Sequence, residues 1–128
     1  MQVMVIKNFE FEAAHWLPEY NGPCAQLHGH SYKLQVGVKG EVDSKTGMVI
    51  DFKLLKKKVN AVLVELDHRC LNDIDKVLEA FPSNCPTAER IARWLFYQLR
   101  GWKWPNKTAQ VVLVRLWETA DSYAEVSE

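Results

Sequence analysis

The feature that most restricts the fold is a strict alternation of side-chain character over residues 28–39. Apolar side chains occupy every second position and polar ones fall between them: Tyr32, Leu34, Val36 and Val38 against Ser31, Lys33, Gln35 and Lys39. Successive side chains of a strand point to opposite faces, so this pattern predicts a half-buried strand of an antiparallel sheet. Residues 2–15 alternate in the same way and end on His15, and the loop between the two segments is rich in Pro, Asn and Gly.

The remaining elements follow from turn and helix signals. The segment DSKTG predicts a turn that leads into a third short strand, residues 48–52. Asp51 is a suitable cap for a helix over residues 52–66, and a second helix is expected from Pro86 to Arg100, ended by Gly101. A last strand is expected over residues 109–119.

This order of elements predicts an α+β fold in which a four-stranded antiparallel sheet carries two helices on one face. No repeat or linker interrupts the 128 residues, so we expect a single domain over residues 1–128. A sheet of this size has exposed edge strands that must be covered or paired. Joining several sheets into a barrel by oligomerisation is one solution.

Composition excludes several classes of partner. Lys plus Arg and Asp plus Glu both number 16, so the net charge is zero and no nucleic-acid partner is expected. No apolar run approaches the roughly 20 residues of a membrane span, and no signal peptide is visible. Three widely separated cysteines do not form a disulfide framework. We therefore expect a soluble, cytoplasmic protein with reduced cysteines.

Three of the four histidines occupy positions that converge. His28 and His30 are two residues apart on one strand and therefore project from the same face, and His15 ends the buried face of the neighbouring segment. Three imidazoles suit Zn²⁺ at about 2.0–2.1 Å and leave a fourth position open, as in catalytic sites. The alternative is a set of ordinary, partly buried histidines.

Cys24 has three possible roles beside such a site. It could be a fourth zinc ligand, or an unligated thiolate with a pKa lowered by the nearby cation, or a loop residue without a role. Asp67 and His68 are adjacent in sequence and could form a tuned acid/base pair, although neighbouring residues do not automatically hydrogen-bond.

Glu118 follows Val112, Val114 and Leu116 at alternate positions, so its carboxylate is expected on an apolar face. A buried carboxylate needs partners, and a ligand with adjacent N–H donors, such as a guanidine-like heterocyclic edge, would supply them. The alternative is a strand end that emerges into water.

Six segments occur in a recognisable order: FEAAHWL, CAQLHGHSYKLQV, GEVDSKTGMVIDF, LDHRCLN, PTAERIA and VRLWET. Together they resemble the family that contains 6-pyruvoyl tetrahydropterin synthase and bacterial 6-carboxytetrahydropterin synthase. The resemblance implies a tunnelling fold, in which subunits join their sheets into a barrel, as a hexamer or tetramer with active sites between subunits. It implies a zinc ion and a small-molecule pterin substrate.

The resemblance also assigns roles to residues. It implies zinc on His15, His28 and His30, a catalytic thiol on Cys24, and an acid/base unit formed by Asp67 and His68. Glu118 would anchor the pterin ring, and Thr87 would contact it. Relatives usually carry Asn where this chain has Cys85, so a weaker cap for the following helix is expected, by about 1 kcal/mol.

Within the family, Cys-x₃-His-Gly-His followed by VIDF is similar to the bacterial 6-carboxy enzymes, whereas the animal pyruvoyl enzymes have a longer gap. Relatives that release 6-hydroxymethylpterin tend to lack this thiol. The expected reaction converts 7,8-dihydroneopterin triphosphate to 6-carboxytetrahydropterin, acetaldehyde and triphosphate, on the route to queuosine. Alternatives are a 6-pyruvoyl enzyme or a zinc-stabilised pterin-binding module without chemistry. Lys33 and Lys53 are candidates for the triphosphate contact.

Overall fold

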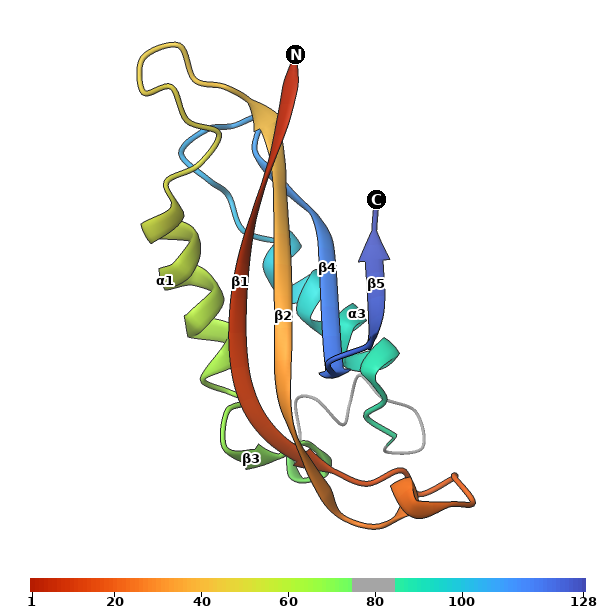
Figure 1. The fold of residues 1–128 in the computed structure, drawn as a ribbon. Helices are drawn as coiled ribbons and strands as arrows, with labels where there is room; N and C mark the ends of the chain where they lie inside the picture. The colour runs from red at the N-terminus through yellow and green to blue at the C-terminus, as the bar shows by residue number, and fades with distance from the viewer. Residues whose placement is uncertain (75–84) are drawn as a thin grey trace.

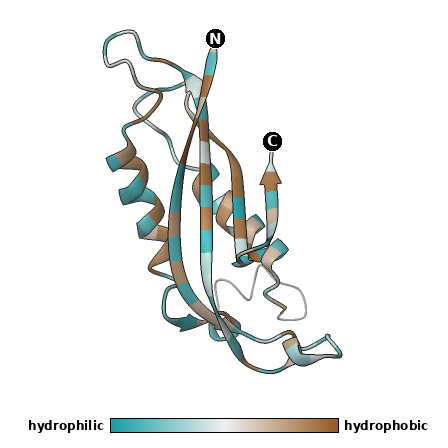
Figure 2. Ribbon diagram, viewed as in Figure 1, coloured by the Kyte–Doolittle hydropathy of each residue, from teal (hydrophilic) through white to brown (hydrophobic). Residues whose placement is uncertain are grey.

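The computed structural model describes residues 1–74 and 85–128 of the chain. Two long strands, β1 (Gln2–His15) and β2 (His28–Glu41), form the centre of a twisted sheet (Figure 1). They pair antiparallel along their whole length, from Gln2 opposite Glu41 to His15 opposite His28. The alternation predicted for both segments is therefore confirmed, and Figure 2 shows it as alternating hydrophilic and hydrophobic bands along the strands.

Over the described residues the sheet has five strands in the order β3-β1-β2-β4-β5. β4 (Gln110–Thr119) and β5 (Ser122–Ser127) continue it antiparallel, whereas the two-residue β3 (Arg69–Cys70) pairs parallel to β1. α1 (Phe52–Leu63) and α3 (Ala88–Arg100) lie behind the sheet in Figure 1. The predicted α+β fold with helices on one face is confirmed, but the count of four strands is wrong.

The core fills the space between the sheet and the helices. The inward positions of β2 and β4 are fully buried at Leu34, Val36 and Leu116. Phe11 on β1 stacks on Tyr32 on β2, with ring centroids 4.9 Å apart. Among the described residues, no helix is long and apolar enough to span a bilayer.

The predicted strand over residues 48–52 is wrong. Val49 and Ile50 are buried, but their backbone is not part of a sheet ladder. The Val49 carbonyl accepts from the Asn106 side chain at 3.1 Å, and the Met48 carbonyl accepts from Asp43 N at 3.0 Å. A short apolar run can be buried as irregular chain when a turn and a side-chain amide satisfy its backbone.

One further boundary differs from the prediction, and one strand was not predicted. α1 ends at Leu63 rather than at residue 66, and turns follow, although Leu66 is still fully buried. β5 was not predicted, because only Ala124 and Val126 mark its inward face. Asp51 caps α1 as expected, since its carboxylate accepts from Lys53 N at 2.8 Å.

Candidate metal centre

Three histidines meet where the hairpin of β1 and β2 ends. The register places His15 directly opposite His28 and Ala13 opposite His30. Period-two alternation then puts all three imidazoles on the helix-covered face, and the ring centroids lie 4.6 to 5.1 Å apart. One ligand nitrogen from each ring lies within 4.8 Å of the others. The predicted convergence of the three side chains is confirmed.

Backbone carbonyls fix the orientation of two of these rings. His15 Nδ1 lies 2.7 Å from the Pro86 oxygen, and His28 Nδ1 lies 2.7 Å from the Gln26 oxygen. A carbonyl only accepts, so both Nδ1 atoms carry the proton and donate it, and both Nε2 atoms present a lone pair. Ligating histidines typically have this outer-shell arrangement.

The three Nε2 atoms lack suitable partners within the described chain. His15 Nε2 and His28 Nε2 are 3.0 Å apart, and two lone-pair nitrogens repel at this distance unless a cation lies between them. His30 Nε2 is buried and forms no hydrogen bond to any described residue. A buried polar atom without a partner is unfavourable. The donor set therefore fits a divalent ion that prefers imidazole, such as Zn²⁺.

Burial disfavours the protonated forms of His15 and His30. His15 is 1% exposed, and desolvation lowers its pKa to about 4, with further lowering by His28 and His30. The His30 pKa is also lowered, chiefly by desolvation and then by His28. Imidazoles that resist protonation keep their lone pairs available to a metal.

Sequence reasoning missed the groups that support the site. Tyr32 is fully buried, and its hydroxyl oxygen lies 3.4 Å from His15 Nδ1. The same alternation that selects His30 points to Tyr32, two residues further along β2. The carbonyls of Pro86 and Gln26 have no comparable signal, because their positions depend on how the loops fold back.

Glu118 follows Val114 and Leu116 on the apolar face of β4, as predicted, and it lies beside the triad. Its Oε1 is 3.8 Å from His15 Nε2, and its side chain is 30% exposed. Burial raises the pKa of this carboxyl, and the nearby Glu89 raises it further. The prediction that Val112 shares this face is wrong, because a bulge lets Val111 pair with Val38 on the buried side.

Cys24 lies near the triad in sequence but outside the cluster. It belongs to the short 3₁₀ turn Pro23–Ala25, its side chain is exposed, and its carbonyl accepts from Leu17 N at 2.9 Å. Within residues 1–74 and 85–128, the group that could hold a metal comprises the three histidines without Cys24. The arrangement gives no support to Cys24 as a fourth ligand.

Asp67 and His68 form a pair, as predicted. The pair lies beside β1 on the side of β3, whereas β2, with His28 and His30, lies on the other side. Asp67 Oδ1 lies 3.0 Å from His68 Nδ1, and the two side chains are 40% and 77% exposed. β1 holds the pair through Glu12, whose N–H donates to Asp67 at 2.8 Å and whose carbonyl accepts from His68 N at 2.6 Å. Hydrogen bonding by Glu12 N, and then His68, lowers the Asp67 pKa. Within the described chain, no hydrogen bond or ion pair links this pair to the triad.

The segment before α3 differs from the prediction. Thr87 is the N-cap, and its hydroxyl accepts from Arg90 N at 3.3 Å, so the helix begins at Ala88 instead of Pro86. Cys85 is not the cap, and the weaker cap expected there is wrong. Thr87 is an intrinsically good cap residue that satisfies the helix end itself.

A family model described as 6-pyruvoyl tetrahydropterin synthase matches residues 4–128. A relative from Haemophilus influenzae named 6-carboxy-5,6,7,8-tetrahydropterin synthase is 35% identical over 97% of this chain and 98% of its own. One from Pyrococcus furiosus named dihydroneopterin monophosphate aldolase is 39% identical over 92% of this chain and 91% of its own.

The structure of Caenorhabditis elegans 6-pyruvoyl tetrahydropterin synthase superposes with a TM-score of 0.86 and 28% identity, covering 100% of this chain and 96% of the other. This likeness confirms the predicted tunnelling fold.

Proposed function

The chain belongs to the 6-pyruvoyl tetrahydropterin synthase family, and we propose that it is a zinc-dependent 6-carboxy-5,6,7,8-tetrahydropterin synthase. The substrate is 7,8-dihydroneopterin triphosphate, and the products are 6-carboxytetrahydropterin, acetaldehyde and triphosphate. The protein acts in the cytoplasm on the route to queuosine, as a single domain that assembles into a homo-oligomer.

The observation that carries this proposal is the convergence of His15, His28 and His30. One ring nitrogen from each lies within 4.8 Å of the others, and two of the rings are oriented by carbonyl oxygens. These residues would hold the zinc ion, which as a Lewis acid would polarise a substrate oxygen and acidify the neighbouring C–H bonds. A site with three protein ligands leaves room for the substrate.

Glu118 and Thr87 orient the pterin in this proposal. The Glu118 carboxyl lies on the wall of a cavity of about 240 Å³ that also includes Glu89 and Ala88, next to the Thr87 cap. Adjacent N–H groups of a pterin edge match a carboxylate with two acceptor oxygens. The Glu118 carboxyl is 3.8 Å from His15, so a ring bound there places its side chain at the triad.

Cys24 removes a proton from the substrate side chain, and Asp67 keeps His68 oriented for proton transfer at a second atom. The Cys24 thiol is exposed on a loop at the triad end of the hairpin. The Asp67–His68 pair lies at the β3 edge of the sheet, on the other side of β1 from His28 and His30, and its side chains are exposed. We therefore place this pair at the triad of a neighbouring subunit, so that each active site lies between subunits.

Mixing two inactive variants tests the shared site. Cys24→Ala and His68→Ala should each be inactive with zinc retained, whereas oligomers re-formed from both should regain part of the activity. A mixture that stays inactive while native mass spectrometry shows mixed oligomers would place all catalytic groups in one subunit.

Three other functions make different predictions. A 6-pyruvoyl enzyme would retain the three-carbon side chain and release no acetaldehyde. An aldolase like the Pyrococcus furiosus relative would release the side chain and leave a 6-hydroxymethylpterin, and the exposed Cys24 thiol argues against it. A zinc-stabilised binding module without chemistry would unfold on chelation, whereas an enzyme with an independent core should remain folded.

Product analysis decides between these functions. The zinc-loaded protein is incubated with 7,8-dihydroneopterin triphosphate, and the products are identified by mass spectrometry. We expect 6-carboxytetrahydropterin with one equivalent each of acetaldehyde and triphosphate. A pyruvoyl product, a hydroxymethylpterin or unchanged substrate would overturn the proposal in favour of the corresponding alternative.

A further inference from the structure

Three hollows follow one another around the end of β4. The acidic hollow contains Glu89, Glu118 and Thr119. The central hollow, of about 360 Å³, contains His30 and Lys33 together with Glu118 and Thr119, which it shares with the first. The shared residues make these two cavities neighbours on either side of Glu118.

The third cavity, the outer hollow, is the largest at about 510 Å³, and its walls include Asn8, Glu10, Lys33, Gln35 and Trp117. It shares Lys33 and Ala120 with the central hollow. The register places Lys33 opposite both Glu10 on β1 and Trp117 on β4. The outer hollow therefore lies on the sheet face that the helices do not cover.

Charge changes along this row of cavities. The acidic hollow has two carboxyl groups, Glu89 and Glu118, whereas Lys33 stands at the junction of the central and outer hollows. Within the described part of the chain Lys33 forms no ion pair, and its side chain is exposed. Its ammonium group is therefore available to an anionic ligand, unlike Arg115 on the same face, which is paired with Glu125.

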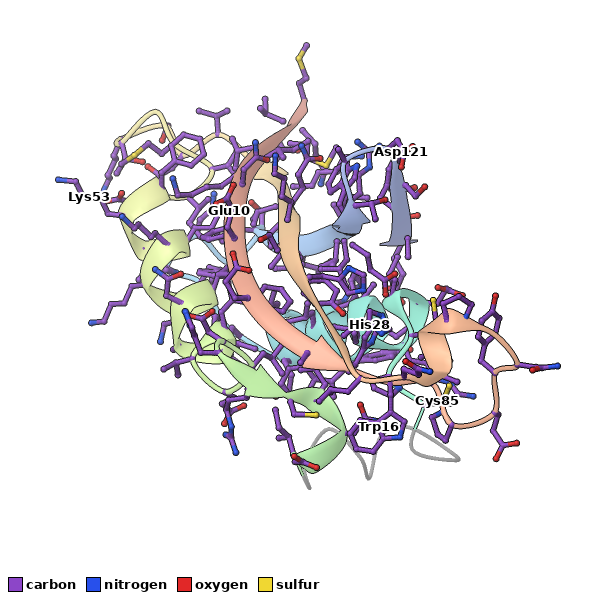
Figure 3. All side chains as sticks on the ribbon, turned by 60° about the horizontal axis from the view of Figure 1, so that its bottom comes forward. Glu10, Trp16, His28, Lys53, Cys85 and Asp121 are labelled. Atoms are coloured by element: carbon purple, nitrogen blue, oxygen red, sulfur yellow. The ribbon has the colours of Figure 1, made fainter. Side chains whose placement is uncertain are left out.

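The spacing matches an elongated substrate. Lys33 is three residues beyond His30 on β2, which corresponds to roughly 10 Å of strand, and it points to the opposite face of the sheet. The central hollow contains both residues, so a ligand with a heterocycle at Glu118 and a short carbon chain at the triad would carry its tail around the end of β4 to Lys33. Lys53 lies far from His28 of the same subunit, across the molecule (Figure 3).

We propose that Lys33 and the outer hollow form the subsite for the triphosphate tail of the substrate. Asn8 and Gln35 supply amide N–H donors there, and Trp117 forms a wall. Glu10 also forms no ion pair within the described chain, and its negative charge would repel a polyanion. A subsite with one cation and one opposing carboxylate binds the tail weakly, which suits a group that must leave as product. This inference rests on the proposed function for the identity of the tail.

Binding of inorganic tripolyphosphate tests the subsite without catalysis. Isothermal titration calorimetry is performed on the zinc-loaded protein without added divalent cation. Lys33→Gln should weaken binding about tenfold, since it removes a charge-assisted contact. Glu10→Gln should strengthen binding by a few-fold. Lys39→Gln is the matched control, because Lys39 is exposed on the same strand and face, and it should leave binding unchanged.

Neopterin, which has the pterin ring and side chain without phosphate, separates this inference from the proposed function. Wild type and Lys33→Gln should bind neopterin equally, while the KM for the triphosphate substrate rises about tenfold in Lys33→Gln. Lys33→Arg should restore most of the tripolyphosphate affinity. Equal weakening by Lys33→Gln and Lys39→Gln, or no weakening, would overturn the subsite. A wild-type protein that neither binds neopterin nor turns over the triphosphate substrate would instead overturn the proposed function.

Discussion

The triad and the Asp67–His68 pair differ in nearly every physical respect, although both consist of ordinary polar side chains on the ends of elements. His15 is 1% exposed and hydrogen-bonded to a distant carbonyl, whereas the His68 side chain is 77% exposed. The triad lies on the covered face of two long paired strands. The pair immediately precedes the two-residue edge strand β3, and His68 has a left-handed backbone conformation, with φ of 60°.

This contrast separates a site that the subunit completes alone from one that it offers at its surface. Pairing along fourteen residues of β1 fixes the imidazoles before any ligand binds. In the pair, by contrast, Asp67 orients His68, but both side chains are exposed to solvent. A preformed cluster of three imidazoles and an exposed Asp–His pair would suit the site between subunits that is proposed above.

The largest expected effect comes from removing one imidazole from each region. His28→Ala should abolish turnover and weaken zinc binding by more than about a hundredfold, since even outer-shell partners are worth about 10–100-fold. His68→Ala should abolish turnover with full zinc content. Zinc content is measured by plasma mass spectrometry after dialysis. Zinc loss in both variants, or in neither, would erase the distinction between the regions.

Asp67→Asn sharpens the role of the exposed pair. The variant retains the shape of the side chain but loses the carboxylate charge that orients and polarises His68. The kcat should fall by about 10²–10⁴-fold, while the zinc content and the KM change little. Steady-state kinetics on zinc-loaded protein checks this. A rate near that of the wild type would make the pair a structural feature of the β3 turn.

The pH dependence of stability should distinguish the buried histidine from the exposed one. The His15 pKa is lowered to about 4 in the folded protein, against 6.5 when unfolded, so the unfolded state takes up a proton first as the pH falls. The metal-free protein should lose about 3 kcal/mol of unfolding free energy between pH 6.5 and 4, with no such contribution from this group above pH 6.5. Urea titrations at several pH values measure it.

The matched variants for this prediction are His15→Gln and His68→Gln. His15→Gln should remove most of the loss, and His68→Gln should retain it. A wild-type stability that is flat over this pH range would contradict the burial of a neutral His15.

The smallest expected effect concerns backbone conformation. A left-handed φ is unfavourable for a residue with a Cβ atom, so His68→Gly should stabilise the protein by about 1 kcal/mol while removing activity. His68→Ala retains the unfavourable conformation and should give no such gain. Thermal unfolding of both variants tests this, and equal melting temperatures would mean that the turn imposes no strain.

Much of this contrast could be predicted from the sequence, for a physical reason. The triad depends on alternation, which survives without knowledge of the tertiary structure, and His15, His28 and His30 follow from it directly. Glu118 was found in the same way. The turn at Asp43 is confirmed, but the strand predicted over residues 48–52 is wrong, because a buried apolar run does not reveal how its backbone is hydrogen-bonded.

What could not be predicted depends on contacts between distant segments. The carbonyls of Pro86 and Gln26, the position of the Thr87 cap and the register of β3 on β1 are set by how loops close. The separation of Asp67 and His68 from the triad belongs to the same class. Adjacency in sequence indicates that two side chains can form a pair, but not which site they serve.

X-ray absorption spectroscopy at the zinc edge tests the central claim most directly. In protein loaded with one equivalent of Zn²⁺, we expect a first shell of nitrogen and oxygen only, at about 2.0–2.1 Å, with the outer-shell scattering of three imidazoles. Cys24→Ala should give the same spectrum. A sulfur contribution at about 2.3 Å that disappears in Cys24→Ala, or fewer than three imidazoles, would contradict a triad of histidines with a free thiol beside it.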